Sequence, residues 1–186
     1  MRYLLLRSLA ALACLGVFSL PQASVALKAD QPDKPNFSGT WTVDLKASTS
    51  LDPLMKEIGA NFLERKYAAS VTLKATLHQT EHVLTIAARG PGFAFDETLY
   101  LNGRTESGHS LNLLGATALT TRAAWSKDHK QLVATYQIKT KQGKEGQLII
   151  KRYLISGGKT LVVAYTLHLN AEPNKTSAQQ IWPKQA

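Results

Sequence analysis

The sequence has almost no cysteine, and this absence limits the chemistry available to the protein. Of its 186 residues only Cys14 is a cysteine, and it lies in an apolar run near the N-terminus. If that segment is removed, the remaining chain can form no disulfide, no thiolate nucleophile and no cysteine-based metal site. The protein must then be stabilised by packing and by backbone hydrogen bonds.

Long apolar runs are also missing. The run Leu9–Leu20 is too short for a membrane-spanning helix, and no later stretch is long enough. Arg2 and Arg7 precede this run, and Ser24-Val25-Ala26 follows it with the small-x-small pattern of a cleavage site. The pattern predicts a cleaved signal peptide over residues 1–26, and therefore a periplasmic or secreted protein.

A lipoprotein anchored through Cys14 is the weaker alternative, because Ala11-Leu12-Ala13 is a poor lipobox. Cleavage after Ala26 would leave 160 residues, enough for one domain with a hydrophobic core. Residues 27–35 contain two prolines and predict a flexible lead-in, so the domain is expected over residues 36–186.

Acidic residues are few, with 13 Asp and Glu against 22 Lys and Arg, which gives a formal net charge of +9. Loss of Arg2 and Arg7 with the signal peptide would lower it to +7. The basic residues are scattered, whereas nucleic-acid-binding proteins concentrate them with aromatic residues on one face. We therefore expect no nucleic-acid partner, and at most weak contact with an anionic membrane surface.

Motifs for catalysis and metal binding are absent from the sequence. It has no Gly-x-Ser-x-Gly elbow and no metalloprotease helix. His78 and His82 lie on either side of a predicted turn without an evident third ligand, and His168 lies on the face opposite Tyr165 and Leu167, which argues against haem. We expect no metal and no cofactor. We favour a protein without catalytic activity over an enzyme on the same scaffold.

The dominant feature that is present is alternation of apolar and polar residues. Phe37–Leu45 alternates with period two, and after Ala69 this period continues almost to the C-terminus, which is typical of half-buried strands. Asn102-Gly103 is a strong signal for a tight hairpin. Further strands are expected at about Thr117–Trp125, Gln131–Lys139, Gln147–Ile155, Thr160–Leu169 and Ser177–Trp182.

One segment, Asp52–Lys66, has the pattern of two short helices. Asp52 can cap the first helix with Pro53 at its first position, and Gly59 can end it. Asn61 can cap the second, with Glu64 three residues later. Eight to ten antiparallel strands with short links predict an all-β sandwich or a closed up-and-down barrel, and we favour the barrel because a helix pair can cover its mouth.

The residues at the start of the domain resemble a known family. Phe37-Ser38-Gly39-Thr40-Trp41 resembles the first-strand Gly-x-Trp signature of the calycins, which include the lipocalins and the fatty-acid-binding proteins. Leu54–Phe62, followed by Arg65-Lys66, is similar to the helix-turn-helix lid of the fatty-acid-binding branch. The chain also resembles bacterial exported lipocalin-like domains that begin with Phe-Ser-Gly-Thr-Trp.

The resemblance implies an architectural role for the first motif. In such barrels the first strand bends as it crosses the closed end, so Gly39 would allow a close approach of the backbone and Trp41 would plug the narrow end. It also implies that Arg152 points inward and reaches a ligand carboxylate. The second arginine of the family is not matched, since Gln180-Ile181-Trp182 stands in its place.

Glu97 is the unusual residue of the predicted barrel, because it shares a face with Phe95 and Leu99. A buried carboxylate is costly unless it is paired. Either a bulge turns Glu97 outward, or it meets a cation such as Arg152.

These patterns predict a monomeric, exported barrel that binds a small hydrophobic or amphipathic molecule. Arg152 or Gln180 would hold its polar end. An enzyme on the same barrel and a ligand-free envelope interaction module remain alternatives. Tyr136 and Tyr165 fall on apolar faces, where tyrosines are more often core than ligand contacts. The candidate ligand contacts are Arg152, Gln180, Trp182, Tyr136, Tyr165, Phe62 and Met55, and the candidate structural residues are Gly39, Trp41 and Glu97.

Overall fold

The computed structural model describes residues 34–111, 115–170 and 172–186, with the side chains of residues 108–111 left out. The predicted signal peptide, residues 1–26, and most of the predicted lead-in lie outside these residues. The elements are β1 (Gly39–Thr42), α1 (Asp52–Ile58), α2 (Phe62–Ser70), β2 (Lys74–Gln79), β3 (Val83–Gly90), β4 (Phe93–Tyr100), β5 (Thr105–Leu111), β6 (Ala116–Trp125), β7 (Leu132–Lys139), β8 (Glu145–Ile155), a short 3-10 turn (Ser156–Gly158), β9 (Thr160–Leu169) and β10 (Thr176–Pro183). No helix in the described part of the chain has the length and apolar character needed to cross a membrane.

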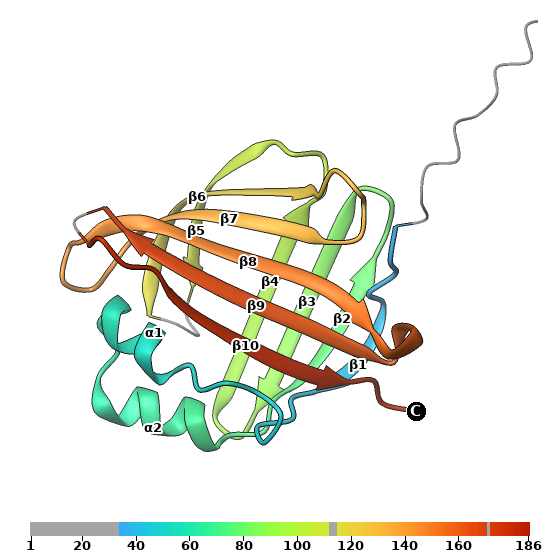
Figure 1. Ribbon diagram of the computed structural model, residues 1–186, viewed down its shortest axis with the longest axis horizontal. Coiled ribbons are helices and arrows are strands. Elements are labelled where there is room, and N and C mark those ends of the chain that lie inside the picture. Colours follow the sequence, from blue (N-terminus) through green and yellow to red (C-terminus); the bar gives the residue numbers. More distant parts are fainter. Residues whose placement is uncertain (1–33, 112–114, 171) are drawn as a thin grey trace, which may run out of the picture. The chain divides into compact units, whose positions relative to one another are not determined.

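The strands form an antiparallel meander in which each strand pairs with the next one along the chain, except at one point. Strands β1 to β4 make one sheet, and β5 to β10 make the other (Figure 1). The apolar positions of the period-two pattern face inward, as in β7, where Leu132, Ala134, Tyr136 and Ile138 are buried. The predicted all-β, up-and-down barrel with a helix pair after the first strand is confirmed, although no continuous ladder closes the two sheets among the described residues.

The exception lies between β4 and β5, where the prediction of a tight hairpin at Asn102-Gly103 is wrong. The chain does turn there, with Gly103 at a φ of +72°, but the two flanking strands do not pair. The turn is held by β6 instead, because Gly103 donates its N–H to the carbonyl of Ala123 (3.0 Å) and accepts from the Arg122 guanidinium (2.8 Å). Strand β4 therefore has a ladder on one edge only.

The other junction between the sheets joins β1 and its following loop to β10 without a continuous ladder. Isolated bridges pair Trp41 with Lys184 and Asp44 with Ile181. Farther along the loop, the Thr49 N–H donates to the carbonyl of Gln179 (2.8 Å). These contacts bring the first and last strands of the domain side by side.

The backbone conformation and the close neighbours of Gly39 require a glycine at this junction. Its φ is +138°, which L side chains rarely adopt, and a Cβ there would lie 2.7 Å from the Lys184 side chain. Lys184 uses the space to place its Nζ 5.3 Å from the centre of the Trp41 ring. Trp41 is completely buried, and its Nε1 donates to the carbonyl of Phe37 (2.9 Å).

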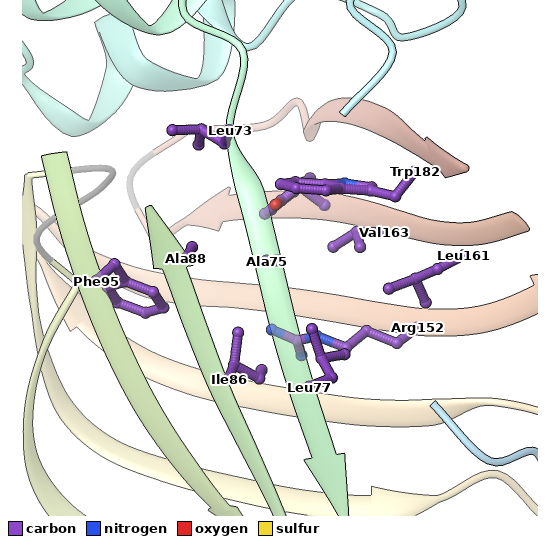
Figure 2. A pocket seen from close by; sticks show the side chains of 11 residues that line it. Leu73, Ala75, Leu77, Ile86, Ala88, Phe95, Arg152, Leu161, Val163 and Trp182 are labelled. Carbon is purple, nitrogen blue, oxygen red and sulfur yellow. The ribbon is translucent and has the colours of Figure 1, made fainter. Parts of the chain in front are cut away.

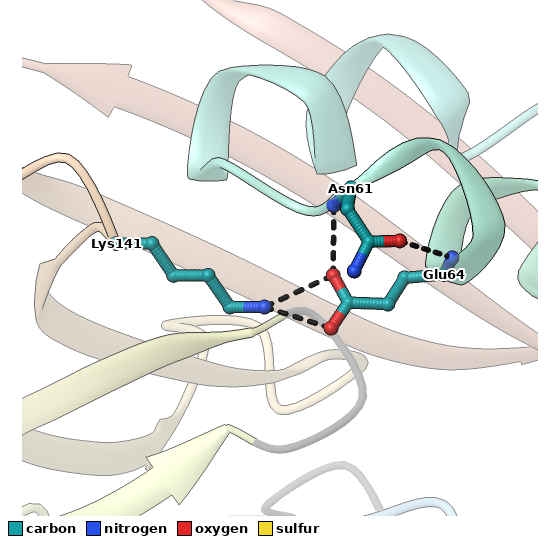
Figure 3. Close-up of polar contacts among 3 residues, drawn as sticks. All are labelled: Asn61, Glu64 and Lys141. Carbon is teal, nitrogen blue, oxygen red and sulfur yellow. Dashed lines mark hydrogen bonds and ion pairs between the residues drawn. The ribbon is translucent and has the colours of Figure 1, made fainter.

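The helix pair begins and ends largely as the local sequence predicts. Gly59 ends α1 in the left-handed conformation, with a φ of +95°. Asn61 and Glu64 form the predicted capping box at the start of α2, shown in Figure 3. The predicted cap of α1 is wrong by one residue, because the N-cap is Leu51 without a side-chain bond, and Asp52 instead forms an ion pair with Arg65 (3.1 Å).

The helices lie over one end of the barrel, as expected for a cover of its mouth. The carbonyl of Ile58, the last residue of α1, accepts from the N–H of Lys141 in the turn between β7 and β8 (3.2 Å). Glu64 of α2 binds Lys141 Nζ (2.7 Å), and the Tyr67 hydroxyl donates to the carbonyl of Pro91 in the turn between β3 and β4. Polar contacts therefore connect the hairpin turns at this end of the barrel to both helices.

Candidate functional site

A cavity of about 60 Å³ lies inside the barrel, with walls contributed by both sheets (Figure 2). Its lining is apolar apart from a few groups. The residues that line it are Leu73, Ala75, Leu77, Ile86, Ala88, Phe95, Arg152, Leu161, Val163, Tyr165 and Trp182.

Two alanines explain why space is left on the side of the four-stranded sheet. Ala75 of β2 and Ala88 of β3 are direct cross-strand partners, and Ala88 is also the partner of Phe95 on β4. Their neighbours along the strands, Leu77 and Ile86, carry larger side chains and form a second pair. A pair of small residues within a face of large ones leaves an indentation, because close-packed neighbours relax only partly into it.

The six-stranded sheet contributes the polar part of the wall. Arg152 on β8 lies opposite Val163 on β9, and Trp182 on β10 lies opposite Leu161. Figure 2 shows the Arg152 guanidinium extending towards Leu77 and Ile86 of the opposite sheet. Arg152 is the one charged residue among the described residues that line the cavity.

Glu97 points inward and meets Arg152, so the structure resolves the two alternatives for this residue. Arg152 Nη2 lies 3.4 Å from Glu97 Oε2, and the two side chains are 8% and 6% exposed. The Tyr136 hydroxyl donates to the other carboxylate oxygen, Glu97 Oε1, at 2.5 Å. Charged groups that are this deeply buried are stable only when such partners are present.

The second polar contact of the site joins Tyr165 and Gln180. The Tyr165 hydroxyl donates to Gln180 Oε1 at 2.9 Å, and both side chains are buried. Two N–H donors on cavity-lining residues have no hydrogen-bond partner among the described residues, namely Arg152 Nη1 and Trp182 Nε1. Buried donors are normally bonded, so these two nitrogens are exceptions, and a molecule that displaced the lining could supply their acceptor.

The protonation states of these groups follow from their burial and charges. Burial, and then the charge of Glu97, raises the pKa of Tyr136 well above its usual value. Burial raises the pKa of Tyr165 to about 12. Burial alone would lower the pKa of Arg152, but Tyr136 and Glu97 outweigh this effect and the pKa is raised. Both tyrosines are therefore neutral donors, and Arg152 stays charged at physiological pH.

The predicted ligand contacts divide into residues that line the cavity and residues that do not. Arg152, Tyr165 and Trp182 line it. Gln180 and Tyr136 are buried behind the lining and hold Tyr165 and Glu97 in place. Met55 is 2% exposed in the core, away from the lining.

Phe62 does not line the cavity: its side chain is 60% exposed on α2, and its ring lies under Lys66 Nζ (5.4 Å). The apolar residue at the start of this helix faces solvent because α2 presents no buried residue to the barrel.

The apolar lining residues were not singled out as ligand contacts, although the period-two pattern already places them on inward faces. The contact between Glu97 and Tyr136 had no local signal, because the two residues are on strands that are not sequence neighbours.

Among the described residues no group of three or more His, Cys, Asp or Glu side chains is placed to bind a metal ion.

Comparison with known proteins places the barrel in a structural context. No family model matches the chain. Its sequence is similar to human intestinal fatty acid-binding protein, with 29% identity over 129 residues that cover 65% of this chain and 91% of that protein. The REP1-NXSQ fatty acid transporter has a similar structure, with a TM-score of 0.62 and 15% identity over 80% of this chain and 96% of that one.

Two further solved structures are similar over nearly their whole length. A Schistosoma mansoni fatty acid binding protein in complex with arachidonic acid matches with a TM-score of 0.61 and 15% identity, over 81% of this chain and 96% of that one. Human cRBP IV matches with a TM-score of 0.60 and 15% identity, over 81% of this chain and 98% of that one. The chain therefore has the helix-covered up-and-down barrel of the fatty-acid-binding proteins, and its sequence is similar to one of them.

Proposed function

We propose that this protein is an exported, non-catalytic binding protein that holds a small hydrophobic or amphipathic molecule inside its barrel. The observation that carries the proposal is the cavity between the two sheets, with an apolar wall from β2 to β4 and polar groups on the opposite wall. Pockets for small molecules typically combine a mainly apolar lining with a few placed polar groups. The names of the similar proteins, which bind or transport fatty acids, support the same class of ligand.

The size of the cavity sets a condition on binding. At about 60 Å³ it is well below the roughly 300–1,000 Å³ of pockets for drug-sized molecules. A ligand must therefore displace side chains of the lining. Phe95 is the residue best placed to move, because it is only partly buried and lies on β4, whose outer edge has no partner strand.

The proposal of export rests on the N-terminal pattern Arg2, Arg7, Leu9–Leu20 and Ser24-Val25-Ala26. Mass spectrometry of the protein purified from its native host tests it: a mature chain that begins at Leu27 supports export, and an intact Met1 overturns it.

A weak contact with anionic membranes is supported by the surface of α2. Phe62 and Leu63 are 60% and 76% exposed, and Lys66 lies beside Phe62. Exposed apolar side chains next to a cation suit the boundary of an anionic bilayer. Co-sedimentation with phosphatidylglycerol vesicles, but not with phosphatidylcholine vesicles, is the expected result. Equal sedimentation with both would contradict an electrostatic contact.

Titration with N-phenylnaphthylamine, an uncharged dye that fluoresces in apolar surroundings, tests the binding function. We expect saturable binding to the wild type. Ala88→Leu fills the indentation and should weaken binding by about tenfold or more, while a thermal melt shows whether the barrel still folds. Ala94→Leu is the matched control, because Ala94 lies on the exposed face of the neighbouring strand β4.

Two results would contradict the proposal. The first is the absence of saturable dye binding to a folded wild type. The second is equal affinity in the wild type and a folded Ala88→Leu variant, which would place the dye outside the cavity.

A further inference from the structure

We propose that the cavity selects molecules whose polar end is uncharged and accepts a hydrogen bond, such as a long-chain alcohol, aldehyde or ester, over molecules that end in a carboxylate. The inference concerns the ligand class and rests on the binding function proposed above. It starts from the charge balance around Arg152, the charged residue of the cavity wall.

The positive charge of Arg152 is already balanced inside the protein. Glu97 lies 3.4 Å from it, and neither side chain is more than 8% exposed. Tyr136, the other partner of Glu97, is a neutral donor and removes none of its negative charge. The buried cluster of these three side chains therefore has no net charge before a ligand enters.

A ligand carboxylate would disturb this balance. It would bring a second negative charge close to Glu97 in a region from which water is largely excluded. Two carboxylates that share such a site cannot both stay ionised without a large penalty. If the ligand instead took Arg152 for itself, Glu97 would remain buried with its ionic partner lost, which is also strongly unfavourable.

The unpaired N–H donors of the lining residues favour a ligand that ends in a hydrogen-bond acceptor. Arg152 Nη1 and Trp182 Nε1 are buried N–H donors without a partner among the described residues. The Tyr165 hydroxyl is already used, because it donates to Gln180. A hydroxyl or carbonyl oxygen of a ligand can accept from one of these donors and leaves the net charge of the cluster unchanged. The donors favour a ligand whose polar end is a hydrogen-bond acceptor, and the charge balance decides that this acceptor should be uncharged.

Decanol and decanoate provide a matched pair for the test, because they share an alkyl chain and differ in the charge of the polar end. Each is used to displace N-phenylnaphthylamine from the wild-type protein at neutral pH. We expect decanol to bind about tenfold or more tightly than decanoate, a difference of about 1.4 kcal/mol or more.

Glu97→Gln tests the cause of this preference, since it removes the charge and keeps the size of the side chain. Decanoate affinity should rise by about tenfold or more in this variant, because Arg152 then has no internal counter-charge, while decanol affinity should change by less than about threefold. Asp96→Asn is the control: it removes a carboxylate from the neighbouring position on β4, where Asp96 is 67% exposed and paired with Arg89. It should leave both affinities unchanged.

The outcomes separate this inference from the proposed function. If the dye binds and decanoate displaces it as well as decanol does, the preference for an uncharged end is wrong and the binding function stands. If the dye does not bind at all, the binding function itself fails. The wild-type comparison decides the question even if Glu97→Gln does not fold.

Discussion

The two helices over the mouth of the barrel are neighbours in sequence but are held to the barrel in different ways. Helix α1 buries Leu54, Met55 and Ile58, each with an exposed fraction of 2% or less. Helix α2 buries no residue, and Leu63 is 76% exposed. Helix α1 is therefore part of the hydrophobic core. Helix α2 contacts the core through the partly buried Ala68, and its other contacts are polar, through Glu64, Arg65 and Tyr67.

This difference indicates which half of the cover can open. Segments with few buried apolar contacts open locally at low free energy, while core segments open only with global unfolding. Helix α2 should therefore detach from the barrel more readily than α1. The difference between the two helices can be tested by four changes, beginning with the one that should have the largest effect.

Truncation of a buried side chain of α1 should have the largest effect. Ile58→Ala leaves a cavity in the core and should lower the free energy of unfolding by about 2–5 kcal/mol, measured by urea denaturation. Leu63→Ala removes a similar side chain from α2. It should change the free energy of unfolding by less than about 0.5 kcal/mol, because the Leu63 side chain is exposed. Similar losses in both variants would show that α2 packs as tightly as α1.

Removal of the cap of α2 should have an intermediate effect. The Asn61 side chain accepts from the Glu64 N–H at 2.9 Å, and Asn61→Ala should cost about 1 kcal/mol of helix stability. Hydrogen exchange should become faster in α2 and remain unchanged in α1. Asn61→Asp keeps an oxygen acceptor and should behave like the wild type, so an effect as large as that of alanine would contradict the role of the cap.

Loss of the ion pair at the start of α2 should have a smaller effect. Lys141 Nζ lies 2.7 Å and 2.9 Å from the two carboxylate oxygens of Glu64 (Figure 3). Lys141→Gln should weaken α2 by roughly 0.2–1 kcal/mol, and less at high salt, because both side chains are partly exposed. The control is Lys144→Gln, which breaks a similar pair with Glu172 away from α2. Faster exchange in α2 in both variants would rule out a specific contact.

Mild acidification should have the smallest effect on the stability of α2. The hydrogen bond from Lys141, and then the Asn61 N–H, holds the pKa of Glu64 below its usual value of 4.5. A carboxyl whose pKa is lowered by folding stabilises the folded state above its unfolded pKa, and this stabilisation is lost as the pH falls through the folded pKa. NMR amide shifts of α2 should therefore change below about pH 4.5, before those of α1. Simultaneous change in both helices would contradict the assignment to Glu64.

The parts of the fold that depend on neighbouring residues could be predicted from the sequence. The inward faces of the strands follow from period-two alternation, and the end of α1 at Gly59 and the capping box of α2 follow from local backbone chemistry. Arg152 could be placed inside by the same alternation, and its burial agrees with this.

The parts that depend on distant residues could not be predicted. Asn102-Gly103 makes the expected turn, but whether β4 and β5 then pair is decided by β6, which holds the turn from the other side. For Glu97 the sequence left two alternatives, and the pairing with Arg152 is the one observed, but the bond from Tyr136 on another strand could not be predicted. The exposure of Phe62 could not be predicted either, because it depends on how both helices lie on the barrel.

The junction between β1 and β10 has a consequence for the order in which the domain folds. Its contacts join Trp41 to Lys184 and Asp44 to Ile181, residues from nearly opposite ends of the domain. The hairpins between can form from neighbouring strands, whereas this junction closes the longest loop in the domain, and its entropy cost must be met before the contacts form. A chain still emerging during synthesis can build the hairpins that precede β10, but until this final strand arrives Trp41 lacks the cover of Lys184, and the barrel stays open.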